Sequence, residues 1–153
     1  MSDEEGCRAY VQHIRSEHQS LERRLANVDA AFQACDVDLV TAMENLKAAL
    51  VHHFAEEDAG GCVEEAVARC PSLGSQADAL EAEHSGRLTD LEAQIETVRK
   101  LKQNARSSES LRRAWQLFHA RLRKHEEAED KLLAASFGCE ESELASFNLR
   151  EPD

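Results

Sequence analysis

The stretch LRRAWQLFHARLRKHEEAEDKL, residues 111–132, decides how this chain folds. One set of positions recurs along it at alternating steps of four and three: Leu111, Trp115, Phe118, Leu122, His125, Glu129 and Leu132. That spacing places all of them on one narrow stripe of a helix, which we call the seam. Three earlier stretches repeat the rhythm, at residues 11–32, 39–57 and 77–98. The sequence therefore predicts four amphipathic helices.

The composition supports one helical domain. Of the 153 residues, 42% are hydrophobic and 31% are charged, which excludes a disordered chain. Aromatic residues make up only 5%, with six glycines and two prolines, too little turn chemistry for a many-stranded sandwich or barrel. Short connections between four long helices predict an all-α, antiparallel up-down-up-down four-helix bundle over residues 1–138. Residues 139–153 form a polar C-terminal extension, with one short helix expected around 140–147.

Capping residues mark the expected helix ends. We expect the second helix to be capped by Asp36 or Asp38, the third to open at Pro71-Ser72 and Ser75, and the fourth at Ser107-Ser108. Gly60-Gly61 is expected to end the second helix and Gly138 the fourth. Residues 62–70, between the second and third helices, are expected to form a short helix across one end.

Charge and cysteine content narrow the class of protein. The formal net charge of −12 disfavours binding to nucleic acid or to an anionic membrane surface. No apolar run reaches the ~18–20 residues of a membrane span, and the acidic start MSDEEGCRAY is unlike a secretion signal. The five cysteines are an odd number and form no CxxC pair, so free thiols are expected. These features predict a cytoplasmic protein.

Six polar residues interrupt the apolar seam, and they are His18, His53, Glu57, His84, His125 and Glu129. The four histidines fall one per helix and at similar depths. Two of them carry a glutamate four residues on, which places each His–Glu pair on one helix face. The six side chains are therefore predicted to meet in one layer of the core.

Burial energetics favour a metal site in this layer. A buried carboxylate without a partner costs several kcal/mol, a large part of the ~5–15 kcal/mol that stabilises a domain. No lysine or arginine lies on the seam there, and Arg87 is only beside it. Imidazole and carboxylate ligands suit iron or manganese, and zinc also accepts them. Two carboxylates from opposite helices are placed to bridge two ions. A polar buried network without metal is the alternative.

The ordered set of motifs resembles the hemerythrin / HHE cation-binding family. It comprises E-H-x-x-L from Glu17 to Leu21, H-F-x-x-E from His53 to Glu57, Glu83-His84, and H-x-x-x-E from His125 to Glu129. The resemblance spans about residues 8–135. It implies a non-haem di-iron site with Glu57 and Glu129 as bridging carboxylates, and an oxo or hydroxo bridge. His18 and His53 would hold one iron, and His84 and His125 the other. Ferritin-type bundles need paired Glu-x-x-His motifs, of which only Glu81-x-x-His84 is present.

The chain departs from the oxygen-carrying members of that family at one point. Those proteins carry two histidines four residues apart in the third helix, whereas the matching neighbours of His84 are Leu80 and Leu88. The candidates for a substitute ligand are Glu22, Glu81 and His119. The residues expected outside the centre are His13 and His52, at the surface, and Tyr10, at the edge of the core.

Three functions remain open from the sequence. The first is a di-iron protein that binds or senses oxygen, nitric oxide or iron. The second is a redox enzyme on the same site that handles peroxide or nitric oxide. The third is a metal-free helical module whose seams bind a partner helix.

Overall fold

The computed structural model describes residues 3–34, 38–59 and 62–136. Every regular element within these ranges is a helix. The elements are α1 (Asp3–Gln33), α2 (Leu39–Ala59), α3 (Cys62–Arg69), the 3₁₀ turn η1 (Pro71–Leu73), α4 (Gly74–Leu101), the 3₁₀ turn η2 (Lys102–Asn104) and α5 (Glu109–Ser136). The predicted all-helical class is therefore confirmed for the described part of the chain.

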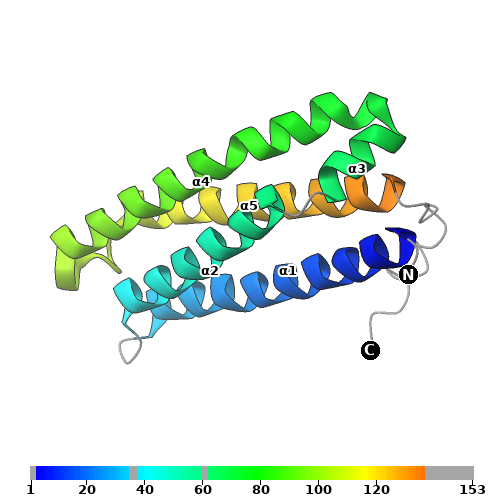
Figure 1. The fold of residues 1–153 in the computed structure, drawn as a ribbon. Coiled ribbons are helices and arrows are strands. Elements are labelled where there is room, and N and C mark those ends of the chain that lie inside the picture. Colours follow the sequence, from blue (N-terminus) through cyan, green and yellow to red (C-terminus); the bar gives the residue numbers. More distant parts are fainter. Residues whose placement is uncertain (1–2, 35–37, 60–61, 137–153) are drawn as a thin grey trace, which may run out of the picture.

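The four long helices α1, α2, α4 and α5 lie side by side (Figure 1). Helix α1 contacts α2 and α5, and α4 contacts the same two helices, so the four helices surround a common interior. The short helix α3 lies at one end, where it contacts α4 and α5. The short helix expected over residues 62–70 is thus present as Cys62–Arg69.

Two apolar clusters fill the interior, and the interrupted part of the seam lies between them. The larger cluster contains Leu21 of α1, Leu91 of α4 and Leu122 of α5. The smaller contains Ile14, Ala77 and Leu132 of the same helices. His18, His84 and His125 each fall between these pairs along their helices. Each fully buried leucine contributes about 1.5–3 kcal/mol, so the apolar clusters provide the stability that permits a polar layer between them.

Within the described residues, the helix ends agree with the predicted caps at Asp38 and Ser108. Asp38 immediately precedes α2, and its carboxylate accepts a hydrogen bond from Thr41 Oγ1 at 2.7 Å. Ser108 Oγ accepts the Leu111 backbone N–H at 3.3 Å, as expected of an N-cap. The expectation for Ser75 is wrong: η1 starts the turn at Pro71, so α4 already begins at Gly74, before Ser75.

Some of the expected features lie outside the described residues. They are Asp36, Gly60-Gly61, Gly138 and the extension 139–153. Among the described residues, Val51 and Leu117 are the large apolar side chains that stay exposed. None of the helices in the described ranges combines the length and apolarity needed to span a membrane.

Candidate metal centre

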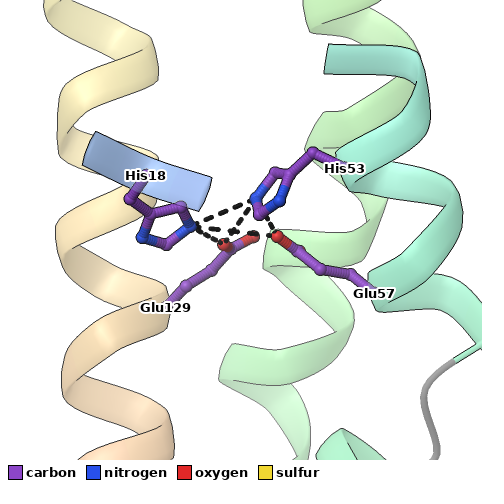
Figure 2. Close-up of side chains that lie close together, drawn as sticks. All are labelled: His18, His53, Glu57 and Glu129. Atoms are coloured by element: carbon purple, nitrogen blue, oxygen red, sulfur yellow. Dashed lines mark hydrogen bonds and ion pairs between the residues drawn. The ribbon is translucent and has the colours of Figure 1, made fainter. Parts of the chain in front are cut away.

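The six polar residues of the seam meet in two overlapping groups. One group is His18, His53, Glu57 and Glu129 (Figure 2), and the other is Glu57, His84, His125 and Glu129. In each group the ligand atoms lie within 4.8 Å of one another. The four imidazoles and Glu129 are buried, and the side chain of Glu57 is 9% exposed. Each of the four long helices contributes to the layer.

The first group joins α1, α2 and α5 through inward-facing Nε2 atoms. His18 Nε2 lies 3.1 Å from His53 Nε2 and 3.2 Å from Glu129 Oε2. His53 Nε2 is in close contact with Glu57 Oε1 on the next turn of α2. Four donor atoms therefore surround one small volume.

The second group joins α2, α4 and α5 in the same manner. His84 Nε2 lies 3.4 Å from Glu57 Oε2 and 3.3 Å from Glu129 Oε1. His125 Nε2 lies 2.5 Å from Glu129 Oε1. Glu57 and Glu129 thus each direct one oxygen to the first group and the other oxygen to the second. This division is what a carboxylate needs in order to bridge two ions.

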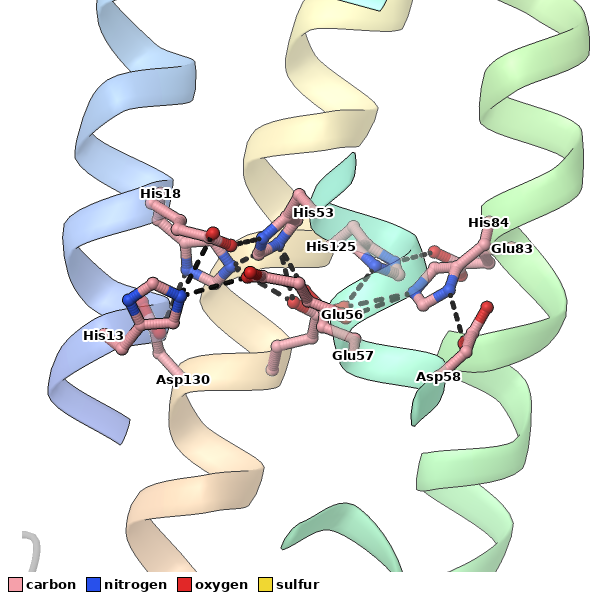
Figure 3. Close-up of polar contacts among 12 residues, drawn as sticks. His13, His18, His53, Glu56, Glu57, Asp58, Glu83, His84, His125 and Asp130 are labelled. Carbon is pink, nitrogen blue, oxygen red and sulfur yellow. Dashed lines mark hydrogen bonds and ion pairs between the residues drawn. The ribbon is translucent and has the colours of Figure 1, made fainter. Parts of the chain in front are cut away.

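A second set of carboxylates holds the outer nitrogens of the four rings (Figure 3). The pairs are His18 Nδ1 with Asp130 at 3.1 Å, His53 Nδ1 with Glu17 at 2.5 Å, His84 Nδ1 with Asp58 at 3.2 Å, and His125 Nδ1 with Glu83 at 2.8 Å. A carboxylate accepts, so each Nδ1 donates its hydrogen outward and each neutral ring presents a lone pair at Nε2. Metal-binding histidines are oriented in this way.

The seam spacing alone does not single out these outer carboxylates, yet the sequence carries a signal for them. Each is the direct chain neighbour of a residue in the centre: Glu17 of His18, Asp58 of Glu57, Glu83 of His84, and Asp130 of Glu129. Each then reaches the histidine of the next helix, from α1 to α2, α2 to α4, α4 to α5, and α5 back to α1. The four pairs therefore link all four long helices in one direction.

The donor set fits a cation on two observations. The Nε2 atoms of His18 and His53 lie 3.1 Å apart, so without a cation one ring must donate a hydrogen bond to the other, whereas a cation between them accepts the lone pairs of both rings. In addition, Glu57 Oε1 and His125 Nε2 are buried and make no hydrogen bond, although each is close to an oppositely charged group. Unsatisfied buried polar atoms are costly, and a cation between the groups would satisfy them together.

The electrostatics of the layer favour positive charge on the rings. Burial lowers the pKa of His18, but the attraction of three surrounding carboxylates, those of Asp130, Glu129 and Glu57, outweighs it and raises the pKa to about 12. The same balance raises the pKa of His53 and of His84 to about 10. Burial raises the pKa of Glu129, but the four imidazoles outweigh it and hold that pKa well below its usual range. Protons and metal ions therefore compete for the same Nε2 atoms.

One further buried carboxyl, Glu126, is not marked by the seam pattern. It is 5% exposed, and its Oε1 makes no hydrogen bond. Burial raises the pKa of Glu126 to about 7, and the neighbouring Glu129 adds to the rise, while His18 and His53 oppose it. The signal that could have found it is position: Glu126 directly follows His125 and lies one turn before Asp130.

The three candidate substitute ligands lie outside both groups. Glu22 is exposed and pairs with Arg123, with Oε1 to Nε at 3.5 Å. His119 pairs with Asp29 at 3.4 Å. Glu81 is exposed at the edge of the cavity described below.

The remaining predictions concern residues around the layer. His13 and His52 are exposed, as expected. Tyr10 is half-buried against the smaller apolar cluster, which matches the predicted position at the edge of the core. Arg87 directs its guanidinium to Asp90, with Nη1 to Oδ2 at 3.5 Å.

A cavity of about 90 Å³ opens beside the second group. Its lining includes His84, Glu57 and Glu129, together with Tyr10, Leu80 and Leu132. A water molecule occupies ~30 Å³ of liquid, so the cavity has room for a molecule of a few heavy atoms. Leu80 lies one turn before His84 and lines the cavity, whereas Leu88, one turn after it, packs against the larger apolar cluster. The two sides of His84 therefore differ.

Comparison of the chain with protein-family models, with curated proteins and with solved structures finds no match. The assignment of the site accordingly rests on the geometry described above.

Proposed function

We propose that this chain is a hemerythrin-like protein, an antiparallel up-down-up-down four-helix bundle that binds two iron ions in its core. In this proposal His18 and His53 hold one ion, His84 and His125 hold the other, and Glu57 and Glu129 bridge them. A small ligand such as oxygen, nitric oxide or peroxide binds at the centre, and the protein serves to bind or sense it.

One observation carries the proposal. Glu57 and Glu129 each divide their two oxygens between the two histidine pairs. A single ion would need only one oxygen from each carboxylate, and a polar network without metal would leave Glu57 Oε1 and His125 Nε2 buried without a hydrogen bond. Two ions satisfy all six groups at once.

The choice of iron rests on ligand chemistry and on the family resemblance. The two groups contain imidazole and carboxylate but no thiolate. This set suits iron or manganese, and zinc accepts it as well. Bound iron would supply redox chemistry and open positions for a small ligand.

The surrounding residues define how a ligand reaches the centre. The cavity beside His84 gives access to the second histidine pair, and Leu80, Leu132 and Tyr10 cover it with apolar and aromatic surface. In the first pair, Asp130 bonds the outer nitrogen of His18 and Glu17 that of His53, and neither ring lines the cavity. We therefore place ligand binding on the side of His84 and His125.

Metal analysis of the purified protein, combined with its visible spectrum, tests the proposal. We expect about two irons per chain and, after exposure to air, the charge-transfer bands of an oxo-bridged pair. The variant Glu129→Gln should lose most of the iron, whereas Glu127→Gln, at an exposed position on the same helix, should keep it. One ion per chain in the wild type, or equal iron in both variants, would contradict the bridging role. Turnover of added peroxide would show instead that the protein is a redox enzyme.

A further inference from the structure

A second cluster of histidine and glutamate lies on the surface where α1 and α2 meet. On α1, His13 and Glu17 are four residues apart, and on α2, His52 and Glu56 have the same spacing. Residues four apart share a helix face, so each helix presents one imidazole and one carboxylate to the same side. Figure 3 shows His13 next to Glu56 at the edge of the buried layer.

Three of these side chains converge on one point. His13 Nε2 lies 3.0 Å from Glu56 Oε2 and 3.2 Å from Glu17 Oε1. One ring nitrogen of His13 and one oxygen from each of the two carboxylates lie within 4.8 Å of one another. The ligand atoms of each buried group meet the same limit. The three donors come from two different helices, so the packing of α1 against α2 fixes their separation.

The second oxygen of each carboxylate is already held by another imidazole. Glu56 Oε1 lies 3.1 Å from His52 Nε2, and Glu17 Oε2 lies 2.5 Å from His53 Nδ1. These contacts orient both carboxylates, leaving one oxygen of each directed at His13. Ligands held by neighbouring groups lose less freedom when they bind an ion, which raises the affinity.

We propose that His13, Glu17 and Glu56 form a surface site for a divalent cation such as Zn²⁺ or Fe²⁺. One imidazole and two carboxylates are a ligand set that both ions accept. The His13 side chain is 53% exposed, so a fourth position faces water and the ion exchanges with solvent. The site does not depend on the proposed iron centre for its ligands.

Glu17 connects this surface site to the buried layer. Its Oε1 faces His13, and its Oε2 accepts from His53, one of the rings of the first buried group. A substitution of Glu17 would therefore disturb both places. The ion pairs of His13 and Glu56 in the described part of the chain join them to one another, to Glu17 and to His52, and to none of the six buried side chains. Changes at these two positions therefore separate the surface site from the centre.

The test counts bound Zn²⁺ by equilibrium dialysis at micromolar free metal. We expect the wild type to bind one more ion per chain than either His13→Ala or Glu56→Gln. His119→Ala is the matched control, because His119 is also paired with a carboxylate but faces only one, Asp29. Its count should equal that of the wild type. In addition, Zn²⁺ should shift the imidazole signals of His13 in an NMR titration.

Equal counts in the wild type, His13→Ala and Glu56→Gln would overturn the proposal. The ions that His13→Ala retains report separately on the buried centre. A difference of one ion with none retained would support the surface site while contradicting the proposed di-metal function. If His13→Ala retained two ions and the wild type bound no more than two, the di-metal function would be supported and the surface site contradicted.

Discussion

At the scale of single residues, the four outer carboxylates, Glu17, Asp58, Glu83 and Asp130, set the orientation in which the rings would meet a cation. Each carboxylate accepts the Nδ1 hydrogen on the outer side of its histidine ring. The lone pair of a neutral ring is then at Nε2, which faces Glu57 and Glu129. The negative charge of the carboxylate also makes Nε2 more basic, so that its lone pair binds a metal ion more strongly. The effect does not require any of the four carboxylates to touch the metal.

The variant Glu83→Gln tests this effect of the outer carboxylate at His125. The Glu83 carboxylate accepts from His125 Nδ1 at 2.8 Å, and a neutral amide in its place would make the Nε2 lone pair less basic. We expect the metal affinity to fall about 10–100-fold, the range measured for such partners elsewhere, with the fold retained. Competition against a chelator of known affinity measures the change. Glu92→Gln, at an exposed position on the same helix, should bind as the wild type does; an equal loss in both variants would contradict the role of Glu83.

The raised pKa values of the rings predict that metal binding releases protons. The pKa of His18 is raised to about 12, and those of His53 and His84 to about 10, when no cation competes. At neutral pH an incoming ion must therefore displace protons from Nε2, and the affinity should rise with pH. Calorimetry in two buffers of different ionisation enthalpy counts these protons. Binding without proton release would show that the rings are neutral in the metal-free chain.

The same shifts fix the sign of the pH dependence of stability. A histidine whose folded pKa exceeds its unfolded value of about 6.5 stabilises the fold fully below that value, and the gain is lost as pH rises toward the folded pKa. The metal-free chain should lose stability as pH rises from about 6.5 through 10 to 12, as the cited pKa values require. Metal binding strengthens over the same range, so the gap in melting temperature between the two forms should widen. If the difference in melting temperature between the two forms did not change with pH, the raised pKa values of the histidines would be contradicted.

At the scale of elements, α4 carries the feature that would separate this chain from oxygen-carrying hemerythrins under the proposed function. His84 is flanked at four-residue spacing by Leu80 and Leu88 instead of by a second histidine. From the sequence the two leucines are equivalent candidates for that missing ligand. The structure distinguishes them, because Leu80 lines the cavity beside His84 and Leu88 packs into the larger apolar cluster.

Leu80→His should therefore bring an imidazole to the side of the centre that faces the cavity. We expect reduced, iron-loaded Leu80→His to be oxidised by dissolved oxygen more slowly than the wild type, because a fifth imidazole fills a position otherwise open to solvent. Some stability should be lost, since a polar group replaces an apolar one. Leu88→His is the control and should change stability without slowing oxidation. Stopped-flow absorbance compares the rates, and equal rates in Leu80→His and the wild type would contradict the idea.

At the scale of the whole molecule, the helical class and the meeting of the six polar residues follow from one repeated spacing. Steps of three and four place residues on one stripe of each helix, and apolar stripes must face one another to be buried. His18, His53, His84 and His125 lie on those stripes, so folding brings them together whatever their chemistry.

The contacts between the outer carboxylates and the Nδ1 atoms of the four histidines could not be predicted in the same way. Glu17 neighbours His18 in the chain but bonds His53 on another helix, a pairing that depends on how far each helix is rotated and displaced. Seam periodicity defines a face of one helix and carries no information on such offsets. The meeting of His13 with Glu56 and the cavity near Leu80 depend on the same offsets, and the cavity also depends on the position of α3. The start of α4 differs from the prediction for a local reason, the 3₁₀ turn at Pro71.

Removing metal should lower the stability of the whole molecule. An ion that binds only the folded chain adds about 4 kcal/mol when its free concentration is a thousandfold above the dissociation constant. At ~2–4 °C per kcal/mol for a chain of this size, chelation should lower the melting temperature by roughly 8–16 °C. Differential scanning calorimetry with and without chelator measures the shift.

The neighbouring histidines of α2 supply a matched pair of variants for that measurement. His53→Ala removes a ring that is 2% exposed and belongs to the first buried group, so chelation should shift its melting temperature much less than that of the wild type. His52→Ala removes a ring that is 70% exposed and contacts Glu56, so its response to chelation should stay close to that of the wild type. The two residues are adjacent in the chain but lie about 100° apart around the helix, so they test which face of α2 holds the metal. Equal responses of the two variants would show that the face carrying His53 and Glu57 does not bind it.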